Sequence, residues 1–266
     1  MKTLHLFLAL TSSALSLVAQ QAPLPNPSSA SSTMNIVFIG DSITFGAWLD
    51  NEGNDKRLAQ APPMNCAHEL EKRMPNTPIY TSNQGYCGYG TGAFLPPATE
   101  AFIAVKSAAE QLKATHPGQL IFSIMLGTND SANTNHVSAV DYHNNLKKTI
   151  DQLLSDFPDC KVVIHHPIWY SPNAHNRWDY EGDSAADRLK SYSPKIDSLV
   201  TEYNSSHPNR VYGGDTFAYQ YFAAYYKSEI VREPGKNGDF YLHPNAIGAA
   251  SLGKFWAAAL CAVLQP

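Results

Sequence analysis

Apolar positions along the chain follow two different periodicities. Five short runs rich in β-branched residues predict strands, at residues 35–39, 79–82, 120–126, 161–168 and 210–212. Between and after them, apolar residues recur at helical spacing in residues 64–74, 98–114, 140–156, 187–204 and 244–263. The third and fourth runs are almost continuously apolar, as expected of parallel strands covered on both faces. This alternation predicts a single α/β domain in which a five-stranded parallel sheet lies between two helical layers.

The first 33 residues differ in composition from the rest of the chain. Lys2 is followed by an apolar stretch over residues 4–18, and Ala19-Gln20 offers a cleavage region, so residues 1–20 are predicted to be a signal peptide. We therefore expect a secreted or periplasmic protein. Residues 21–33 are rich in Pro, Ser, Ala and Gln and predict a flexible linker before a domain at 34–266. No later run reaches the length of a membrane span, so we expect no transmembrane helix.

Charge and cysteine content narrow the choice of partners. The 266-residue chain has a net charge of −4, so it lacks the basic excess that binding to nucleic acid or anionic lipid requires. The chain has four cysteines: Cys66, Cys87, Cys160 and Cys261. Their spacing matches no zinc-ligand pattern, and we expect neither a metal nor a cofactor. Whether they form disulfides or remain buried thiols stays open, as does the oligomeric state.

Polar segments follow the predicted strands, where open α/β sheets usually bind their ligands. Two long ones, residues 50–57 and 171–187, are predicted binding loops, with a solvated surface loop as the plainer alternative. Ser42 follows the first strand, residues 83–91 follow the second, and Asn129 follows the third, while His243 precedes the last helix. Because parallel strands end at one edge of a sheet, we expect these groups to lie close together.

Together these groups meet the needs of acyl transfer through serine. Ser42 offers a nucleophile and His243 a base, while backbone N–H groups and the Asn129 amide offer donors for an oxyanion. Each residue also has a structural interpretation by itself. Ser42 would cap a helix, Asn129 would form a turn, and His243 before Pro244 would open a helix. Their joint occurrence in this order favours catalysis.

The same segments resemble the SGNH hydrolases, also called the GDSL esterase/lipase family, over residues 35 to about 255. The four blocks of that family match, in order, Gly40-Asp41-Ser42-Ile43, residues 83–88, Gly127-Thr128-Asn129-Asp130 and His243-Pro244-Asn245. The resemblance implies a three-layer, flavodoxin-like α/β/α fold with Ser42 as nucleophile and His243 as base. It also implies that Ser42, Gly88 (rather than Gly85) and Asn129 form the oxyanion hole. Asp239 is expected to orient His243, although it stands four residues before the histidine where the family has three; a backbone carbonyl is the alternative.

The resemblance implies ester hydrolysis through an acyl-enzyme but leaves the substrate open. Seven aromatic residues are expected near the mouth of the site, where they would suit sugars unless they serve ordinary packing: Trp48, Tyr86, Tyr89, Trp169, Tyr170, Trp178 and Tyr241. The candidate substrate-binding residues are Trp169, Tyr170, Arg177, Trp178 and Tyr241. We expect a carbohydrate O-acetylesterase similar to bacterial enzymes that deacetylate sugars. Its substrate would be an acetylated polysaccharide, or an O-acetylated sialic acid whose carboxylate pairs with Arg57 or Arg177.

Two other functions stay open. One is a secreted lipid esterase or lysophospholipase, and the other is a non-catalytic carbohydrate-binding protein on the same scaffold.

Overall fold

The computed structural model describes residues 33–176 and 179–264, which fall within one compact unit of the chain. The predicted signal peptide and all but the last residue of the predicted linker lie outside the described residues. Five parallel strands form the central sheet in the order β4-β1-β5-β6-β7. Their bounds are β1 Met34–Gly40, β4 Ile79–Gly85, β5 Gln119–Met125, β6 Lys161–Ile164 and β7 Val211–Gly213. The predicted five-stranded parallel α/β fold is therefore confirmed.

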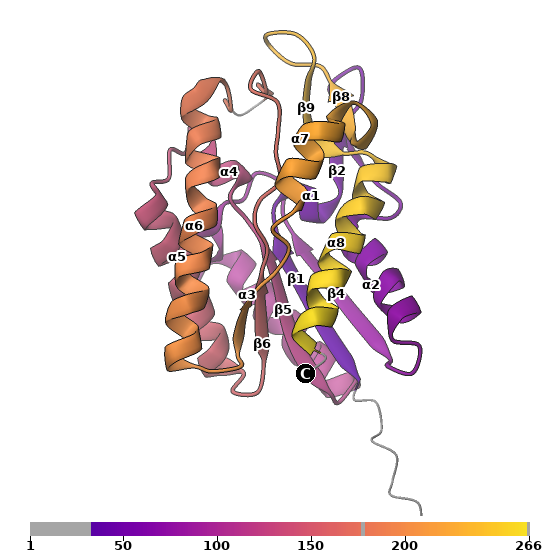
Figure 1. Ribbon diagram of the computed structural model, residues 1–266, viewed down its shortest axis with the longest axis vertical. Helices are drawn as coiled ribbons and strands as arrows, with labels where there is room; N and C mark the ends of the chain where they lie inside the picture. The colour runs from indigo at the N-terminus through magenta and orange to yellow at the C-terminus, as the bar shows by residue number, and fades with distance from the viewer. Residues whose placement is uncertain (1–32, 177–178, 265–266) are drawn as a thin grey trace, which may run out of the picture. The chain divides into compact units, whose positions relative to one another are not determined.

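Helices cover both faces of this sheet (Figure 1). On one face lie α3 Glu100–Thr115, α5 Ala139–Asp156 and α6 Gly182–Ser206, and on the other lie α2 Pro62–Arg73, α7 Ala218–Glu229 and α8 Ala246–Leu264. The alternation of β1 explains the two cores. Val37 and Ile39 pack in the first, whereas Ile36 and Phe38 pack in the second. Short helical turns complete the list: α1 Ser42–Phe45, η1 Thr91–Phe94 and α4 Thr128–Ser131.

Two antiparallel hairpins were not anticipated. One joins β2 Ala47–Leu49 to β3 Asp55–Arg57, and the other joins β8 Ile230–Glu233 to β9 Phe240–Pro244. Figure 1 shows α1, β2, β8 and β9 gathered at one end of the central sheet. The second hairpin takes up Pro244, so the last helix begins at Ala246 instead of residue 244. The sequence analysis also did not predict α7.

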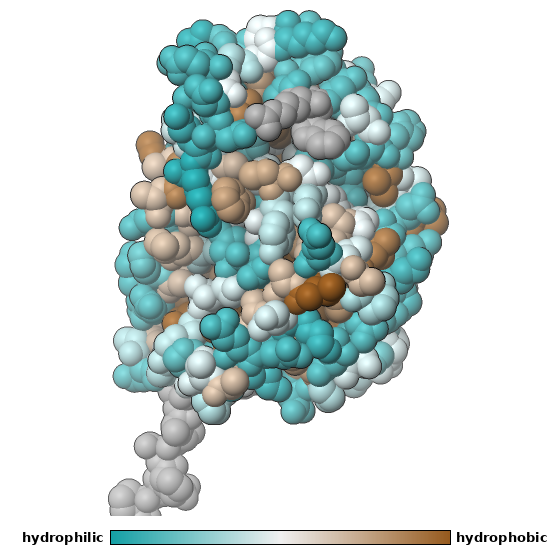
Figure 2. All heavy atoms as spheres, turned by 180° about the vertical axis from the view of Figure 1, so that it is seen from behind, coloured by the Kyte–Doolittle hydropathy of each residue, from teal (hydrophilic) through white to brown (hydrophobic). Residues whose placement is uncertain are grey.

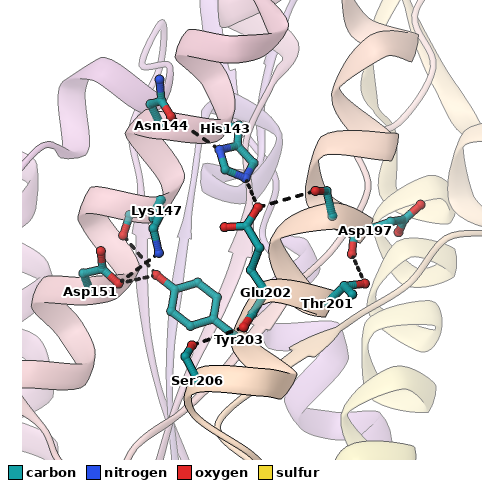
Figure 3. A network of polar contacts seen from close by, with 10 residues as sticks. His143, Asn144, Lys147, Asp151, Asp197, Thr201, Glu202, Tyr203 and Ser206 are labelled. Atoms are coloured by element: carbon teal, nitrogen blue, oxygen red, sulfur yellow. Dashed lines mark hydrogen bonds and ion pairs between the residues drawn. The ribbon is translucent and has the colours of Figure 1, made fainter.

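Polar contacts join α5 to α6 on the outer side of their layer (Figure 3). His143 Nε2 lies 2.9 Å from Glu202 Oε1, and the Tyr203 hydroxyl donates to Asp151 Oδ1 at 2.5 Å. The ammonium of Lys147 lies 4.7 Å from the centre of the Tyr203 ring. These contacts hold the two helices together.

The face of the molecule seen in Figure 2 is largely hydrophilic, and its hydrophobic residues lie in small scattered groups.

One described helix, α8, is long and apolar enough to cross a membrane by length and composition alone. Its Leu252, Trp256 and Leu260 are buried in the core of the domain. Packing against the sheet accounts for this apolar face, because a helix that covers a parallel sheet needs such a face.

Replacing Trp256 tests how much the α8 layer contributes to stability. The indole is 1% exposed and stacks on Phe38, with ring centroids 5.8 Å apart. We expect Trp256→Ala to lower the free energy of unfolding by about 3–5 kcal/mol, because it opens a large cavity in the core. Urea denaturation measures the loss. Ile247→Ala, at a position of the same helix that is 61% exposed, serves as the control and should change stability by less than about 0.5 kcal/mol.

Candidate active site

Ser42 lies at the tight turn between β1 and α1. Asp41 caps that helix by accepting a hydrogen bond from the Ile43 N–H at 2.9 Å, so Ser42 is the first helical residue and not the cap. A side chain at Gly40 would come within 1.9 Å of the Thr44 hydroxyl, which explains why the turn needs glycine. Burial raises the pKa of the Asp41 carboxyl to about 6, although the Ile43 N–H opposes that shift. The sequence thus presents the Ser42 hydroxyl at the carboxyl edge of the sheet.

The imidazole of His243 reaches this hydroxyl from the other end of the chain. Its Nε2 lies 2.9 Å from Ser42 Oγ, across 201 positions of sequence. Both side chains are almost wholly buried, His243 near the end of β9 and Ser42 at the start of α1. The distance is that of a hydrogen bond, as a nucleophile and its general base require.

Glu233 holds the other nitrogen of the imidazole, and this corrects the prediction made for Asp239. The two Glu233 carboxylate oxygens lie 2.8 and 3.0 Å from His243 Nδ1. Oε1 also accepts a hydrogen bond from the Leu49 N–H of the β2–β3 hairpin at 2.6 Å. Asp239 is paired with Arg232 at the exposed surface instead. Neighbouring strand residues face opposite sides, so Arg232 points outward to Asp239 while Glu233 is completely buried.

These contacts fix the electrostatic state of the imidazole. Burial by itself would lower the pKa of His243, but the charge and hydrogen bond of Glu233, together with the charges of Asp41 and Asp55, outweigh burial, and the net shift is upward. Because the carboxylate accepts the Nδ1 proton, the neutral ring has a free electron pair on Nε2, toward Ser42. The histidine is therefore set up as a base.

Gly88 and Asn129 lie beside Ser42 in the same cavity. Gly88 has φ of 79°, a left-handed conformation that glycine adopts readily. The Asn129 amide nitrogen donates to the Tyr89 carbonyl at 3.0 Å, and its oxygen accepts from the Tyr180 hydroxyl at 2.6 Å. Gly85 has another role, since a side chain there would come within 2.3 Å of the Phe45 nitrogen. The arrangement thus places Gly88 and Asn129 on the wall of the cavity that Ser42 also lines.

Asp130 links the second and third polar segments. Its carboxylate accepts hydrogen bonds from the Thr91 N–H at 2.9 Å and from the Thr91 hydroxyl at 2.5 Å. The carboxyl is 1% exposed and turned away from the cavity lining. Its role is to hold the loop that carries Gly88 against α4, which carries Asn129.

The cavity above Ser42 has a volume of about 250 Å³. Both predicted binding loops contribute to it: the β2–β3 hairpin supplies Asp55 beside Trp48 and Leu49, and the loop after β6 supplies Asn176 and Tyr180. The remaining lining residues are Ala47, Cys87 and Leu242 together with Ser42, Gly88, Asn129 and His243. The lining therefore combines apolar side chains, among them Trp48, Leu49 and Leu242, with polar groups.

Most of the predicted aromatic residues lie away from this lining. Tyr170 is buried and its hydroxyl lies 2.9 Å from Ser131 Oγ, while Trp169 and Tyr241 both pack against Tyr226. The expectation that these three bind substrate is therefore not supported by their positions. Tyr86 and Tyr89 stack on each other, and of the seven aromatic residues only Trp48 lines the cavity among those described.

Of the two arginines considered for a substrate carboxylate, the structure describes Arg57. Arg57 lies over the Phe45 ring at 4.0 Å and borders a separate groove. Arg177 and Trp178 lie outside the described residues.

Cysteines and metal-type ligands are accounted for by structural contacts. None of the four cysteines, all of which are described, forms a disulfide bond. His165 is buried, with Nε2 at 2.9 Å from Ser123 Oγ and Nδ1 accepting from the Asp215 N–H. In the described part of the chain, the side chains that could jointly hold a metal ion are His175, Asp179 and Glu181. His175 Nδ1 lies 3.3 Å from Glu181 Oε2 and 3.9 Å from Asp179 Oδ1 within this loop.

The sequence reasoning missed Glu233 and the part played by Tyr180. A signal for the hairpin that carries Glu233 was present, since Pro234-Gly235 and Asn237-Gly238 separate two short runs with strand-type side chains. Nothing local marked Tyr180, because its partner Asn129 is 51 positions away.

Comparisons with known proteins agree with this geometry. The model of the GDSL-like lipase/acylhydrolase family matches residues 38–250. A carbohydrate acetylesterase from Sinorhizobium meliloti has a similar structure (TM-score 0.60, 18% identity, 87% of this chain and 100% of that one), as has an aryl esterase from M. smegmatis (TM-score 0.60, 19% identity, the same coverage). A lipase/acylhydrolase from Enterococcus faecalis is similar at a TM-score of 0.58 and 18% identity, over 88% of this chain and 98% of that one.

At these identities the structural matches establish the fold, and no curated protein matches the sequence significantly. The family model covers most of the chain, and its match includes Ser42, Gly88, Asn129 and His243. The chain belongs to the GDSL-like lipase/acylhydrolase family and is a carboxylic ester hydrolase of that family.

Proposed function

We propose that the protein hydrolyses O-acetyl esters of carbohydrates through an acyl-enzyme on Ser42. The observation that carries this proposal is the hydrogen-bonded series Ser42–His243–Glu233 beneath a cavity lined by Gly88 and Asn129. Such a series supplies nucleophile, base and orienting acid in the order that serine esterases need.

The geometry supports the following sequence of steps. His243 Nε2 removes the hydroxyl proton as Ser42 Oγ bonds to the acyl carbon, and Glu233 stabilises the imidazolium that forms. The carbonyl oxygen becomes an oxyanion that faces the N–H groups of Ser42 and Gly88 and the Asn129 amide. The imidazolium then protonates the departing sugar oxygen as its bond to the acyl carbon breaks. Water, deprotonated by His243, then attacks the acyl carbon; the bond to Ser42 Oγ breaks, the imidazolium returns the proton to Oγ, and acetate is released.

The cavity favours a small acyl group on a neutral sugar. A volume of about 250 Å³ accommodates an acetyl group and part of one sugar but is small for a long acyl chain. The acidic side chain of Asp55 lies in the wall, which favours neutral acetylated sugars over sialic acids.

A panel of esters tests the proposed activity. We expect released acetate from acetyl-xylan and acetylated neutral sugars, less from O-acetylated sialic acids, and little hydrolysis of long-chain p-nitrophenyl esters. Ser42→Ala should reduce kcat on p-nitrophenyl acetate by at least about 10³-fold, because it removes the nucleophile. Retained activity in Ser42→Ala would refute the mechanism. Binding of the sugars without acetate release would instead favour a non-catalytic binding protein, and a preference for long acyl chains would favour a lipid esterase.

A pair of substitutions separates the two acids near His243. Glu233→Gln should lower kcat by about 10²–10⁴-fold, since the neutral amide cannot stabilise the imidazolium and leaves the ring poorly oriented. Asp239→Asn is the matched control, and we expect a change of less than about threefold because that carboxylate pairs with Arg232 on the surface. Steady-state kinetics with p-nitrophenyl acetate measures both. A larger loss in Asp239→Asn than in Glu233→Gln would restore Asp239 as the orienting acid.

The raised pKa of His243 makes a prediction about pH. The base must be neutral to accept the Ser42 proton, so kcat/KM should fall as pH drops through the pKa of His243, which lies above its ordinary value of 6.5. Glu233→Gln removes the largest contribution that raises this pKa, so the acid limb of the remaining activity should move to lower pH. A pH profile of kcat/KM from 4.5 to 9 measures the shift, and an unmoved limb would show that another group controls it.

A further inference from the structure

Asn129 can assist catalysis only if its amide is turned the right way. The Nδ2 group donates hydrogen bonds, whereas Oδ1 accepts them, and the two ends have nearly the same shape. Rotation of the amide by a half turn would bring Oδ1 toward a developing oxyanion and repel it. The site therefore needs contacts that distinguish the two ends of this side chain.

Two described contacts make this distinction. The Tyr89 carbonyl can only accept, so it takes one Nδ2 hydrogen at 3.0 Å and leaves the second for the cavity that Asn129 lines. On the opposite end, the Tyr180 hydroxyl lies 2.6 Å from Oδ1. Asn129 is 1% exposed, so water does not compete freely for either end.

Tyr180 is itself held firmly in place. The side chain is 2% exposed, and its ring meets Tyr170 edge-on with centroids 5.3 Å apart. The neighbouring peptide oxygens are bound by Asn133, which donates from N to the Asp179 oxygen at 2.6 Å and from Nδ2 to the Glu181 oxygen at 2.9 Å. Asn133 follows α4 closely, so the turn that carries Asn129 and the loop that carries Tyr180 are joined on both sides of the tyrosine.

We infer that Tyr180 is a positioning residue for the oxyanion hole, which holds the Asn129 amide with its N–H directed into the cavity. Burial raises the pKa of the Tyr180 phenol well above its ordinary value, so the hydroxyl keeps its proton and remains a donor. The inference rests on the proposed esterase function. The inference goes beyond that function because it gives a positioning role to a residue that is not expected to form or break a bond.

Tyr180→Phe removes only the hydroxyl and tests the inference. We expect kcat on p-nitrophenyl acetate to fall by about 10- to 100-fold, which is less than the 10²–10³-fold loss typical of a missing oxyanion donor, while KM changes by less than about threefold. Inhibition by phenylboronic acid, which forms a tetrahedral adduct with serine, should weaken by a similar factor. Tyr203→Phe is the matched control. It removes the hydroxyl of another buried tyrosine, whose partner Asp151 lies on α5, and should alter kcat by less than about threefold.

A double-mutant cycle shows whether Tyr180 acts through Asn129. In an Asn129→Ala background, Tyr180→Phe should change kcat by less than about threefold, because no amide is left to orient. Equal losses in both backgrounds, or no loss in Tyr180→Phe alone, would overturn the inference. Thermal melting of each variant identifies the temperature at which all are folded, and kinetics are compared there. If wild-type and Ser42→Ala proteins hydrolyse the ester equally, the proposed function fails instead, so the two failures are distinguishable.

Discussion

The buried carboxylate of Glu233 is the group on which the arrangement of the site depends. An ionised carboxylate loses several kcal/mol of hydration on burial unless hydrogen-bond donors replace the water. Here the donors are His243 Nδ1 and the Leu49 N–H, which come from β9 and from the β2–β3 hairpin. Satisfying this one charge therefore draws together the strand that carries the base and the hairpin that forms the cavity wall. Trp48 and Leu49, which line the cavity, are positioned by the same contact that orients the histidine.

The parallel sheet supplies the remaining groups through its topology. β1, β4 and β5 are neighbours in the sheet, so Ser42, Gly88 and Asn129 follow strands that end side by side. Asp130 then bonds to Thr91 and ties the second of these segments to the third. The segments after the central strands thus carry the nucleophile and the proposed oxyanion donors. The β8–β9 hairpin adds the base and its acid, and the β2–β3 hairpin adds a hydrogen-bond donor to that acid.

This division explains what could be predicted from the sequence. Ser42, Gly88, Asn129 and His243 belong to short motifs beside recognisable strands or the last helix, and the structure brings these residues to one cavity. The orienting acid was sought by its spacing from His243, which led to Asp239. Glu233 is ten residues from His243, and only the register of the β8–β9 hairpin, with its irregularity between Ile230 and Arg232, decides which acid faces inward. The aromatic content of the sequence likewise does not show which aromatic side chains face the cavity, because Trp169 and Tyr241 pack against Tyr226 instead.

The charges around His243 impose a compromise on the base. Burial favours the neutral ring, whereas Glu233, Asp41 and Asp55 all favour the imidazolium. A base with a raised pKa removes a hydroxyl proton more readily, and its cation is stabilised when it forms in the transition state. The same stabilisation leaves a larger share of the resting protein protonated and inactive at acidic pH. A carboxylate in direct contact with Nδ1 strengthens the base and also increases its protonation at acidic pH. Burial of the pair limits this protonation, because it penalises the charged ring before substrate arrives. Completely buried Glu233 therefore orients the imidazole strongly and still allows it to reach its neutral form. A solvent-exposed acid such as Asp239, which is already paired with Arg232, would not provide this combination.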